Sequence, residues 1–311
     1  MSATFPLSPT ARLARALSVF TVTVLCVALG ASAPTSAAPG DPTPFGDWDG
    51  DGWSDVLVRD ASRHGSLYIY RGSADGLIAP PTQISSAWNG MNAITRHGDM
   101  GGDAHEDIVA RQGNTGELFL YPGTGLANPN ALSTRVRIGA SGWNAMSEIT
   151  PVGDLDGDAK GDLVAVQTAT GQLFFYPGRG AAPFGPRRLI GGSGWNGLDE
   201  LTGVGDLDAD GDVDLVARQK STANIYLYPG SGAGSTARFG PSVLISPGGA
   251  GWRSMESFVG VGDVDRDGKI NLLAVASTSG YELRGYTLTN GKLVTATGDG
   301  TGWGRHLRPI F

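Results

Sequence analysis

Short apolar runs, separated by polar and glycine-rich turns, recur along most of the chain. One kind of run is aliphatic and β-branched, and an aromatic-rich run follows it after a polar turn. The aliphatic runs occupy residues 56–58, 108–110, 163–166, 215–217 and 272–275, and the aromatic-rich runs occupy residues 67–70, 118–121, 173–176 and 225–228. Apolar runs this short, bounded by turn residues, predict β-strands.

Two further runs complete a repeating unit. One alternates polar and apolar residues, as an exposed outer strand does, and lies at 135–138, 187–190 and 242–245. The other follows a tryptophan that recurs every 51 to 57 residues, at Trp88, Trp143, Trp195, Trp252 and Trp303. An aspartate-rich segment recurs at a similar interval and begins at Asp47, Asp99, Asp154, Asp206 and Asp263. The chain therefore contains five units of four predicted strands each.

The repeats predict an all-β fold, a five-bladed β-propeller of four-stranded blades. A β-propeller arranges such sheets radially, usually about four to eight of them. A linear solenoid is the competing architecture, but its ends need atypical capping repeats. Here the two ends complement each other, because the first unit lacks the strand after the tryptophan and the last unit ends with it. We expect this C-terminal strand to complete the first blade and close the ring.

Residues 1–38 predict a signal peptide, and residues 39–311 predict the propeller. Arg12 and Arg15 precede an apolar run at 16–29, and small residues follow it up to Ala38. Cleavage there removes Cys26, the only cysteine. A lipid anchor on Cys26 is the alternative, although Leu25 stands where a lipobox has a small residue. No later run reaches the ~20 apolar residues of a membrane span, so we expect a secreted, extracellular protein without membrane insertion.

Composition and charge narrow the class of partner. The chain has 49 glycines, 18 prolines and only 17% charged residues, a composition that disfavours helix bundles. Removing two of the 23 basic residues and none of the 30 acidic ones changes the formal net charge from −7 to −9. Nucleic acid is therefore not an expected partner, because phosphate binding needs clustered lysine and arginine.

The aspartate-rich segments have the spacing of a calcium-binding loop. In the first, carboxylates stand at positions 1, 3, 5 and 9 of nine residues, and Gly52 stands at position 6. Alternate oxygens on a tightly turned backbone converge on one point, as the hard oxygen ligands of Ca²⁺ do. The alternative is an aspartate-rich turn held by side-chain to backbone hydrogen bonds alone. Four carboxylates this close repel one another unless a cation neutralises them, which favours the metal.

Four of the five segments keep enough of this pattern to predict a site. The expected metal ligands are Asp47, Asp49, Asp51, Asp55, Asp154, Asp156, Asp158, Asp162, Asp206, Asp208, Asp210, Asp214, Asp263, Asp265, Asp267 and Asn271. The second segment has Gly101 at position 3 and keeps only Asp99, Asp103 and Asp107, which predict a weaker site. We expect about four Ca²⁺ ions, and up to five.

The unit at 153–166, followed by Leu-Phe-Phe-Tyr-Pro-Gly, resembles the FG-GAP or VCBS repeats of integrin-α-like propellers. The resemblance covers nearly all of 39–311 and implies calcium loops between the first two strands of a blade. Integrin-type propellers have seven blades. Five blades are more similar to tachylectin-type sugar-binding propellers, which lack these loops. The glycine- and alanine-rich, exported chain also resembles actinobacterial extracellular proteins of this repeat family.

The recurring tryptophans predict a second functional element, because most have a polar neighbour. An indole face stacks on a pyranose ring, a nearby amide reaches the hydroxyls, and repetition around a ring adds avidity on a polymeric glycan. The expected ligand-binding residues are Trp88, Asn89, Trp143, Asn144, Trp195, Asn196, Trp252 and Trp303. The alternative is that each tryptophan packs between adjacent blades.

The sequence favours recognition over catalysis. It has no Gly-x-Ser-x-Gly elbow and no His-Glu-x-x-His helix. His105 and Glu106 lie in the degenerate second segment and mark either a specialised site or a decayed calcium loop. We expect a secreted, calcium-binding, lectin-like module that binds carbohydrate or a cell-surface polymer multivalently, alone or as the targeting subunit of a larger extracellular assembly. An integrin-like module for protein adhesion, using loops such as 124–134, is the alternative, and a secreted hydrolase is less favoured.

Overall fold

The computed structural model describes residues 46–74, 76–77, 80–96, 98–231, 238–277, 281–298 and 307–311. All of them lie in one compact unit, Ala33–Phe311. The predicted signal peptide and Trp303 lie outside the described residues. In the part of the chain that is described, no helix is both long and apolar enough to cross a membrane.

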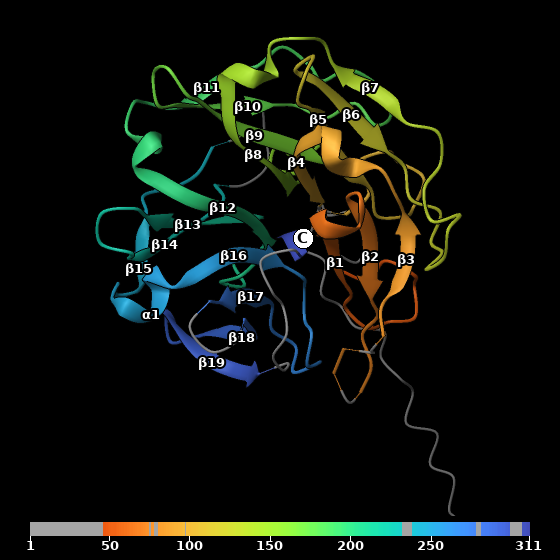
Figure 1. The fold of residues 1–311 in the computed structure, drawn as a ribbon. Coiled ribbons are helices and arrows are strands. Elements are labelled where there is room, and N and C mark those ends of the chain that lie inside the picture. The colour runs from red at the N-terminus through yellow and green to blue at the C-terminus, as the bar shows by residue number, and fades with distance from the viewer. Residues whose placement is uncertain are drawn as a thin grey trace, which may run out of the picture. The chain divides into compact units, whose positions relative to one another are not determined.

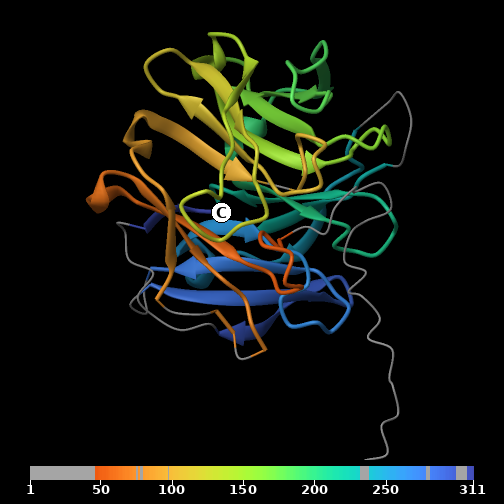
Figure 2. The same cartoon turned by 90° about the vertical axis from the view of Figure 1, so that its right-hand side faces the viewer.

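The described strands form five antiparallel sheets of four strands, which we call blades 1 to 5. From the inner to the outer strand, they are β20 (Leu307–Ile310), β1 (Val56–Asp60), β2 (Ser66–Tyr70) and β3 (Thr82–Ser85); β4 (Met91–Arg96), β5 (Ile108–Gln112), β6 (Glu117–Tyr121) and β7 (Val136–Gly139); β8 (Met146–Gly153), β9 (Asp162–Gln167), β10 (Gln172–Tyr176) and β11 (Arg188–Gly191); β12 (Leu198–Gly205), β13 (Asp214–Gln219), β14 (Ile225–Tyr228) and β15 (Val243–Ser246); β16 (Met255–Gly260), β17 (Asn271–Ala276), β18 (Glu282–Thr289) and β19 (Lys292–Gly298). The inner strands surround the C-terminus and the outer strands lie at the periphery (Figure 1; Figure 2 gives the side view). The predicted five-bladed propeller is confirmed.

The C-terminal strand β20 completes blade 1. It pairs with β1, with Val58 opposite Ile310 and Asp60 opposite Leu307. Leu57 and Phe311 exchange two backbone hydrogen bonds of 2.8 Å each. The first and last strands of the ring therefore belong to one sheet, as the complementary chain ends predicted.

The second strand of each blade is buried on both faces, because its neighbours are the adjacent blades. All six residues of β17 are buried, and so are five of the six in β9. Strands covered on both sides read as continuous aliphatic runs rather than alternating ones. The outer strands are more exposed, and Val243 in β15 and Leu189 in β11 are exposed hydrophobic residues.

The second residue of each aspartate segment anchors that segment to the core. Trp48, Met100, Leu155 and Leu207 are buried, and each packs between its own blade and the next. The corresponding Val264 is partly buried between blades 5 and 1. Each aspartate segment is thus fixed at one end by an interblade apolar contact, which places its carboxylates reproducibly.

Short helical turns carry the recurring tryptophans from an outer strand to the next inner strand. They are η2 (Trp88–Gly90), η3 (Trp143–Ala145), η4 (Trp195–Gly197) and α1 (Ala250–Arg253), while a further turn, η1 (Ala61–Arg63), links β1 to β2. The backbone N–H groups of Trp88, Trp143 and Trp195 donate to the carbonyls of Gly65, Gly116 and Gly171. These bonds tie each turn to the hairpin of its own blade.

Candidate metal centres

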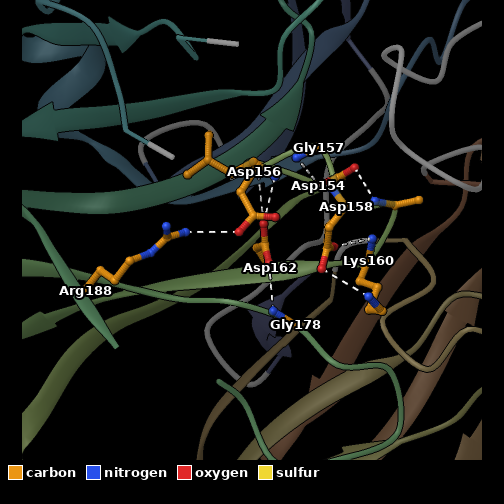
Figure 3. Close-up of polar contacts among 10 residues, drawn as sticks. Asp154, Asp156, Gly157, Asp158, Lys160, Asp162, Gly178 and Arg188 are labelled. Atoms are coloured by element: carbon orange, nitrogen blue, oxygen red, sulfur yellow. Dashed lines mark hydrogen bonds and ion pairs between the residues drawn. The ribbon is translucent and has the colours of Figure 1, made fainter. Parts of the chain in front are cut away.

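Each aspartate segment leads into the second strand of its blade, and in blades 2 to 5 it follows the C-terminal end of the inner strand. We call the segments loop 1 (47–55), loop 2 (99–107), loop 3 (154–162), loop 4 (206–214) and loop 5 (263–271). Loop 3, between β8 and β9, shows the common geometry (Figure 3). Asp154 accepts backbone N–H bonds from Gly157, Asp158 and Ala159 at 2.7–2.9 Å, so the chain wraps around its carboxylate.

This wrapping needs two residues in the left-handed region. In loop 3 they are Gly157, with φ of 77°, and Ala159, with φ of 62°. Glycine adopts such angles readily, whereas alanine is strained there. Ala159 nevertheless keeps the turn, because the carboxylate of Asp154 accepts its N–H.

The carboxylate at position 9 joins two strands of its blade. Asp162 is fully buried, and it accepts the N–H of Leu155 at 2.9 Å and the N–H of Gly178, just beyond β10, at 2.7 Å (Figure 3). Loops 1, 2 and 4 repeat the second bond through the pairs Asp55–Gly72, Asp107–Gly123 and Asp214–Gly230. A Cβ at Gly178 would lie 2.0 Å from the carbonyl oxygen of Gly161, so glycine is required.

Blade 5 changes both partners of this contact together. Asn271 replaces the aspartate and still accepts the N–H of Val264, at 2.7 Å. Its amide then donates to the hydroxyl of Thr287 at 2.8 Å. Thr287 directly follows Tyr286, at the position where blades 2, 3 and 4 have the proline that precedes the glycine. The glycine of the Pro-Gly pair that follows the third strand in blades 2, 3 and 4 is therefore one partner of this contact.

Carboxylate oxygens converge in four of the five loops. In each, one oxygen from each of three aspartates lies within 4.8 Å of the other two. The groups are Asp47, Asp49 and Asp55; Asp154, Asp156 and Asp162; Asp206, Asp208 and Asp210; and Asp263, Asp265 and Asp267. Of the other expected aspartate ligands of these loops, Asp51, Asp158 and Asp214 lie outside the groups. Every group contains the aspartates at positions 1 and 3. The third member is the aspartate at position 9 in loops 1 and 3, and the aspartate at position 5 in loops 4 and 5.

Loops 1 and 3 each contain a buried oxygen without a partner. One oxygen of Asp49 lies 3.1 Å from Nε of Arg71, and one oxygen of Asp156 lies 3.0 Å from Nη2 of Arg188. The other oxygen, Oδ1, of each aspartate is buried and has no hydrogen-bond partner among the described residues. An unpaired buried carboxylate oxygen is costly, and a hard cation is the partner that all-oxygen donor sets accept.

Burial raises the pKa of the aspartates at position 9 above the ordinary range of a carboxyl group. Desolvation raises the pKa of Asp162 and of Asp214 to about 8, and that of Asp55 to about 7. Backbone hydrogen bonds from the glycines act in the opposite direction but are weaker. A divalent cation would stabilise the ionised forms that burial disfavours.

Loop 2 has the same turn but not the same cluster. Asp99 accepts three backbone N–H groups, as Asp154 does, but with Gly101 at position 3 the described carboxylates of this loop do not converge in a group of three. Glu106 forms a buried ion pair with Arg96 and accepts the N–H of Gly46 at 2.5 Å. A buried charge pair thus pins the start of the described chain to blade 2.

The tryptophans lie between blades. The rings of Trp88 and Tyr121, of Trp143 and Tyr176, of Trp195 and Tyr228, and of Trp252 and Tyr286 have centroids 4.4–4.8 Å apart. Trp88 and Trp143 are 4% and 8% exposed, so neither offers a face on which a sugar could stack. The prediction of ligand stacking is therefore wrong for these two, because each indole fills a blade junction.

The neighbouring amides also have structural partners. The side-chain amides of Asn144 and Asn196 donate to the carbonyls of Gly113 and Thr168 at 3.1 and 2.9 Å. Arg253, which follows Trp252, donates to the carbonyl of Ser221 at 3.2 Å. These three polar residues thus tie their turns to a hairpin of the same blade. Asn89 lies close to the backbone of Gly65, where an added Cβ would come within 2.6 Å of its Oδ1.

Comparisons with known proteins agree with this architecture. A family model described as FG-GAP-like repeat matches residues 47–110 and 206–274, which include loops 1, 2, 4 and 5. The crystal structure of regucalcin, a calcium-binding protein from Agrobacterium tumefaciens, is similar over 71% of this chain and 67% of that one, with 14% identity and a TM-score of 0.37. This likeness is too distant to support a functional argument. None of the curated proteins matches the sequence.

Proposed function

Because the chain is a β-propeller built from FG-GAP-like repeats, we propose that it is a secreted, calcium-stabilised recognition module without catalytic function. The observation that carries the calcium assignment is the pair of buried, unpartnered oxygens of Asp49 and Asp156, each inside a group of three converging carboxylates. The four groups contain only aspartates, and such oxygen ligands suit Ca²⁺ better than a transition metal.

Calcium would hold two segments of one blade together in blades 1, 3, 4 and 5. Position 1 ends the inner strand and position 9 begins the second strand, so an ion held by Asp154, Asp156 and Asp162 joins β8 to β9. The backbone N–H bonds to Asp154 and Asp162 already hold these side chains in place, which reduces the conformational entropy lost on binding. Extracellular calcium of ~1 mM would fill loops whose Kd is ~0.1 mM.

Recognition of carbohydrate or of a cell-surface polymer remains the role that we propose for the ring. The signal-peptide pattern of residues 1–38 supports an extracellular location. Polar recesses along the inner strands of the blades support a binding role, because arginine, asparagine and glutamate side chains line them. Because Trp88 and Trp143 are buried, we expect the ligand to contact these recesses rather than the tryptophans at the blade junctions.

Calcium titration of a loop 3 variant against its loop 2 counterpart tests the calcium assignment. We expect isothermal titration calorimetry to count about four sites in the purified protein, and Asp156→Asn to remove one of them. Asp103→Asn, the matched control in loop 2, should leave the count unchanged. Equal counts for the two variants, or no heat with Ca²⁺ at all, would contradict the assignment.

Glycan binding is measured separately. A polysaccharide pull-down in the presence of Ca²⁺ should retain the protein, and free sugar should release it. A stoichiometric protein that co-purifies from the culture supernatant and resists free sugar would favour adhesion to a protein partner instead.

A further inference from the structure

Three blades carry an arginine at the same position of their second strand. Arg59, Arg111 and Arg218 are the fourth, fourth and fifth residues of β1, β5 and β13. Arg111 donates to the carbonyls of Trp143 and Met146 at 2.8 and 2.6 Å, and Arg218 donates to those of Trp252 and Met255 at 3.0 and 2.5 Å. Each of these two arginines therefore clasps the backbone at the beginning of the next inner strand.

In blade 4 this arginine has two carboxylate partners. Asp199 accepts from Nε and Nη2 of Arg218 at 2.8 and 3.2 Å, and Glu200 lies 3.7 Å from Nη2. The second oxygen of Glu200 accepts the backbone N–H of Phe258, in blade 5, at 3.1 Å. Glu200 thus connects the guanidinium of its own blade to a backbone donor of the next blade.

In blade 2 both carboxylates are missing. Asn92 stands at the position of Asp199 and accepts from Nε of Arg111 at 2.7 Å, while Ala93 stands at the position of Glu200. Among the described residues, no aspartate or glutamate forms an ion pair with Arg111, and no side chain accepts the N–H of Ile149, which corresponds to Phe258. Desolvation lowers the pKa of Arg111, which has no carboxylate partner among the described residues. The pKa of Arg218 is raised, because Asp199 and Glu200 outweigh the desolvation of its guanidinium.

The absent glutamate leaves a recess. A cavity of about 530 Å³ lies where the side chain of Ala93 ends, and Arg59 and Arg111 both line it. Its other polar walls come from Asn92, Asn144, Ser147, Glu148 and Thr168, and its apolar walls come from Ala93, Ile94, Met146 and Ile149. The recess lies at the N-terminal ends of β4 and β8, whereas loops 2 to 5 follow the C-terminal ends of the inner strands.

We propose that this recess between blades 2 and 3 binds the carboxylate of an acidic sugar, a uronate unit of a polymeric glycan. The sugar carboxylate takes the place that Glu200 fills in blade 4, between the guanidinium of Arg111 and the N–H of Ile149. The amides and hydroxyls of Asn92, Asn144 and Ser147 suit the ring hydroxyls. The assignment rests on the proposed recognition function and names the ligand class for it.

One carboxylate of the recess opposes the ligand's charge. Glu148 lines the wall, but its Oε2 accepts the N–H of Leu201, in blade 4, at 3.4 Å. Its pKa is raised by burial, which reduces the negative charge that it presents. With Arg59 and Arg111 on the other walls, the recess keeps an excess of positive charge.

Calorimetry on the full-length, calcium-loaded protein tests the proposal with three probes of equal length. These are a galacturonate trimer, a galactose trimer and a glutamate tripeptide. We expect the galacturonate trimer to bind at least tenfold more tightly than the other two at low ionic strength, and added salt to weaken it. Equal binding of galactose would overturn the anion site while leaving glycan recognition intact, and equal binding of the peptide would overturn the sugar assignment.

An isosteric variant isolates the role of Arg111. Asn92→Asp supplies the counter-ion that blade 4 has in Asp199, so we expect at least tenfold weaker galacturonate binding and an unchanged or higher Tm. Gln83→Glu adds the same charge on the exposed strand β3 and should leave binding unchanged. Unchanged binding in Asn92→Asp, or an equal loss in Gln83→Glu, would overturn the site, whereas failure of calcium binding would concern the proposed function instead.

Discussion

Loops 2 and 3 have the same backbone turn but differ in the carboxylates that it carries. Asp99 and Asp154 both hold their turns by three N–H bonds, and Asp107 and Asp162 both fasten a glycine after the third strand. Loop 3 adds Asp156 and its unpartnered oxygen, whereas loop 2 has glycine at that position. The difference shows that positions 1 and 9 hold the backbone turn in both loops, and that three carboxylates converge only where position 3 is an aspartate.

Calcium removal should produce the largest effect and should separate the two loops. At tenfold excess over Kd, each site contributes RT ln 11, about 1.4 kcal/mol, so four sites contribute ~6 kcal/mol. We expect EDTA to lower the Tm by many degrees, and hydrogen exchange to speed up at loops 1, 3, 4 and 5 but not at loop 2. Uniform exchange across all five loops would mean that loop 2 also holds a metal.

Breaking the charge pair of loop 2 should be the next largest effect. Glu106→Ala leaves Arg96 buried without its carboxylate, which costs about 3–5 kcal/mol. Chemical denaturation should show the same loss with Ca²⁺ and with EDTA, because no metal is involved. A loss that disappears in EDTA would link Glu106 to calcium.

Substitutions at position 9 should have a smaller effect on stability and should again distinguish loop 2 from loop 3. Asp107→Asn and Asp162→Asn both keep an acceptor for the glycine N–H, so each should cost about 1–2 kcal/mol through one weakened or lost hydrogen bond. Only Asp162→Asn should in addition weaken calcium binding, as calorimetry would measure. The combination of Asp162→Asn with Pro177→Thr copies the Asn271–Thr287 pair of blade 5 and should recover part of the loss.

The pH dependence should be the smallest effect. In the metal-free protein the folded-state pKa of Asp162 and Asp214 is about 8, well above that of an exposed aspartate. The folded state then binds more protons than the unfolded state between roughly pH 4 and pH 8, so stability falls as the pH rises through this window. Calcium competes with these protons, and the Tm difference between Ca²⁺ and EDTA should widen from pH 5 to pH 8. Parallel curves would contradict the raised pKa values.

The sequence predicted the architecture well because repetition exposes it. Blade number, strand order and ring closure follow from the spacing of the aspartates and tryptophans. The roles of single residues were harder to predict, since a repeated Trp-Asn pair looks alike whether it meets a sugar or a neighbouring blade. Only the contacts of Trp143 with Tyr176 and of Asn144 with Gly113 distinguish the two.

The roles of the remaining site residues depend on contacts between strands, which become visible in the sequence only when the repeats are compared. The pairing of Asp162 with Gly178 joins residues in different strands, and the coupled change to Asn271 and Thr287 in blade 5 is its trace in the sequence. Aligning the five units by position would also have shown that Arg111 lacks the acids that accompany Arg218. Reading each motif alone hides such differences, because their meaning lies in the comparison of one blade with the next.

The exchange of backbone hydrogen bonds between Leu57 and Phe311 has a kinetic consequence. These residues are separated by most of the chain, so the seam forms only after the intervening blades are in place, and loop-closure entropy slows that step. We therefore expect the seam to be the last part of the molecule to form and the first to open. A disulfide bond across the seam, formed by a cysteine pair at these two positions, would keep the ring closed once the slow final step of folding is complete.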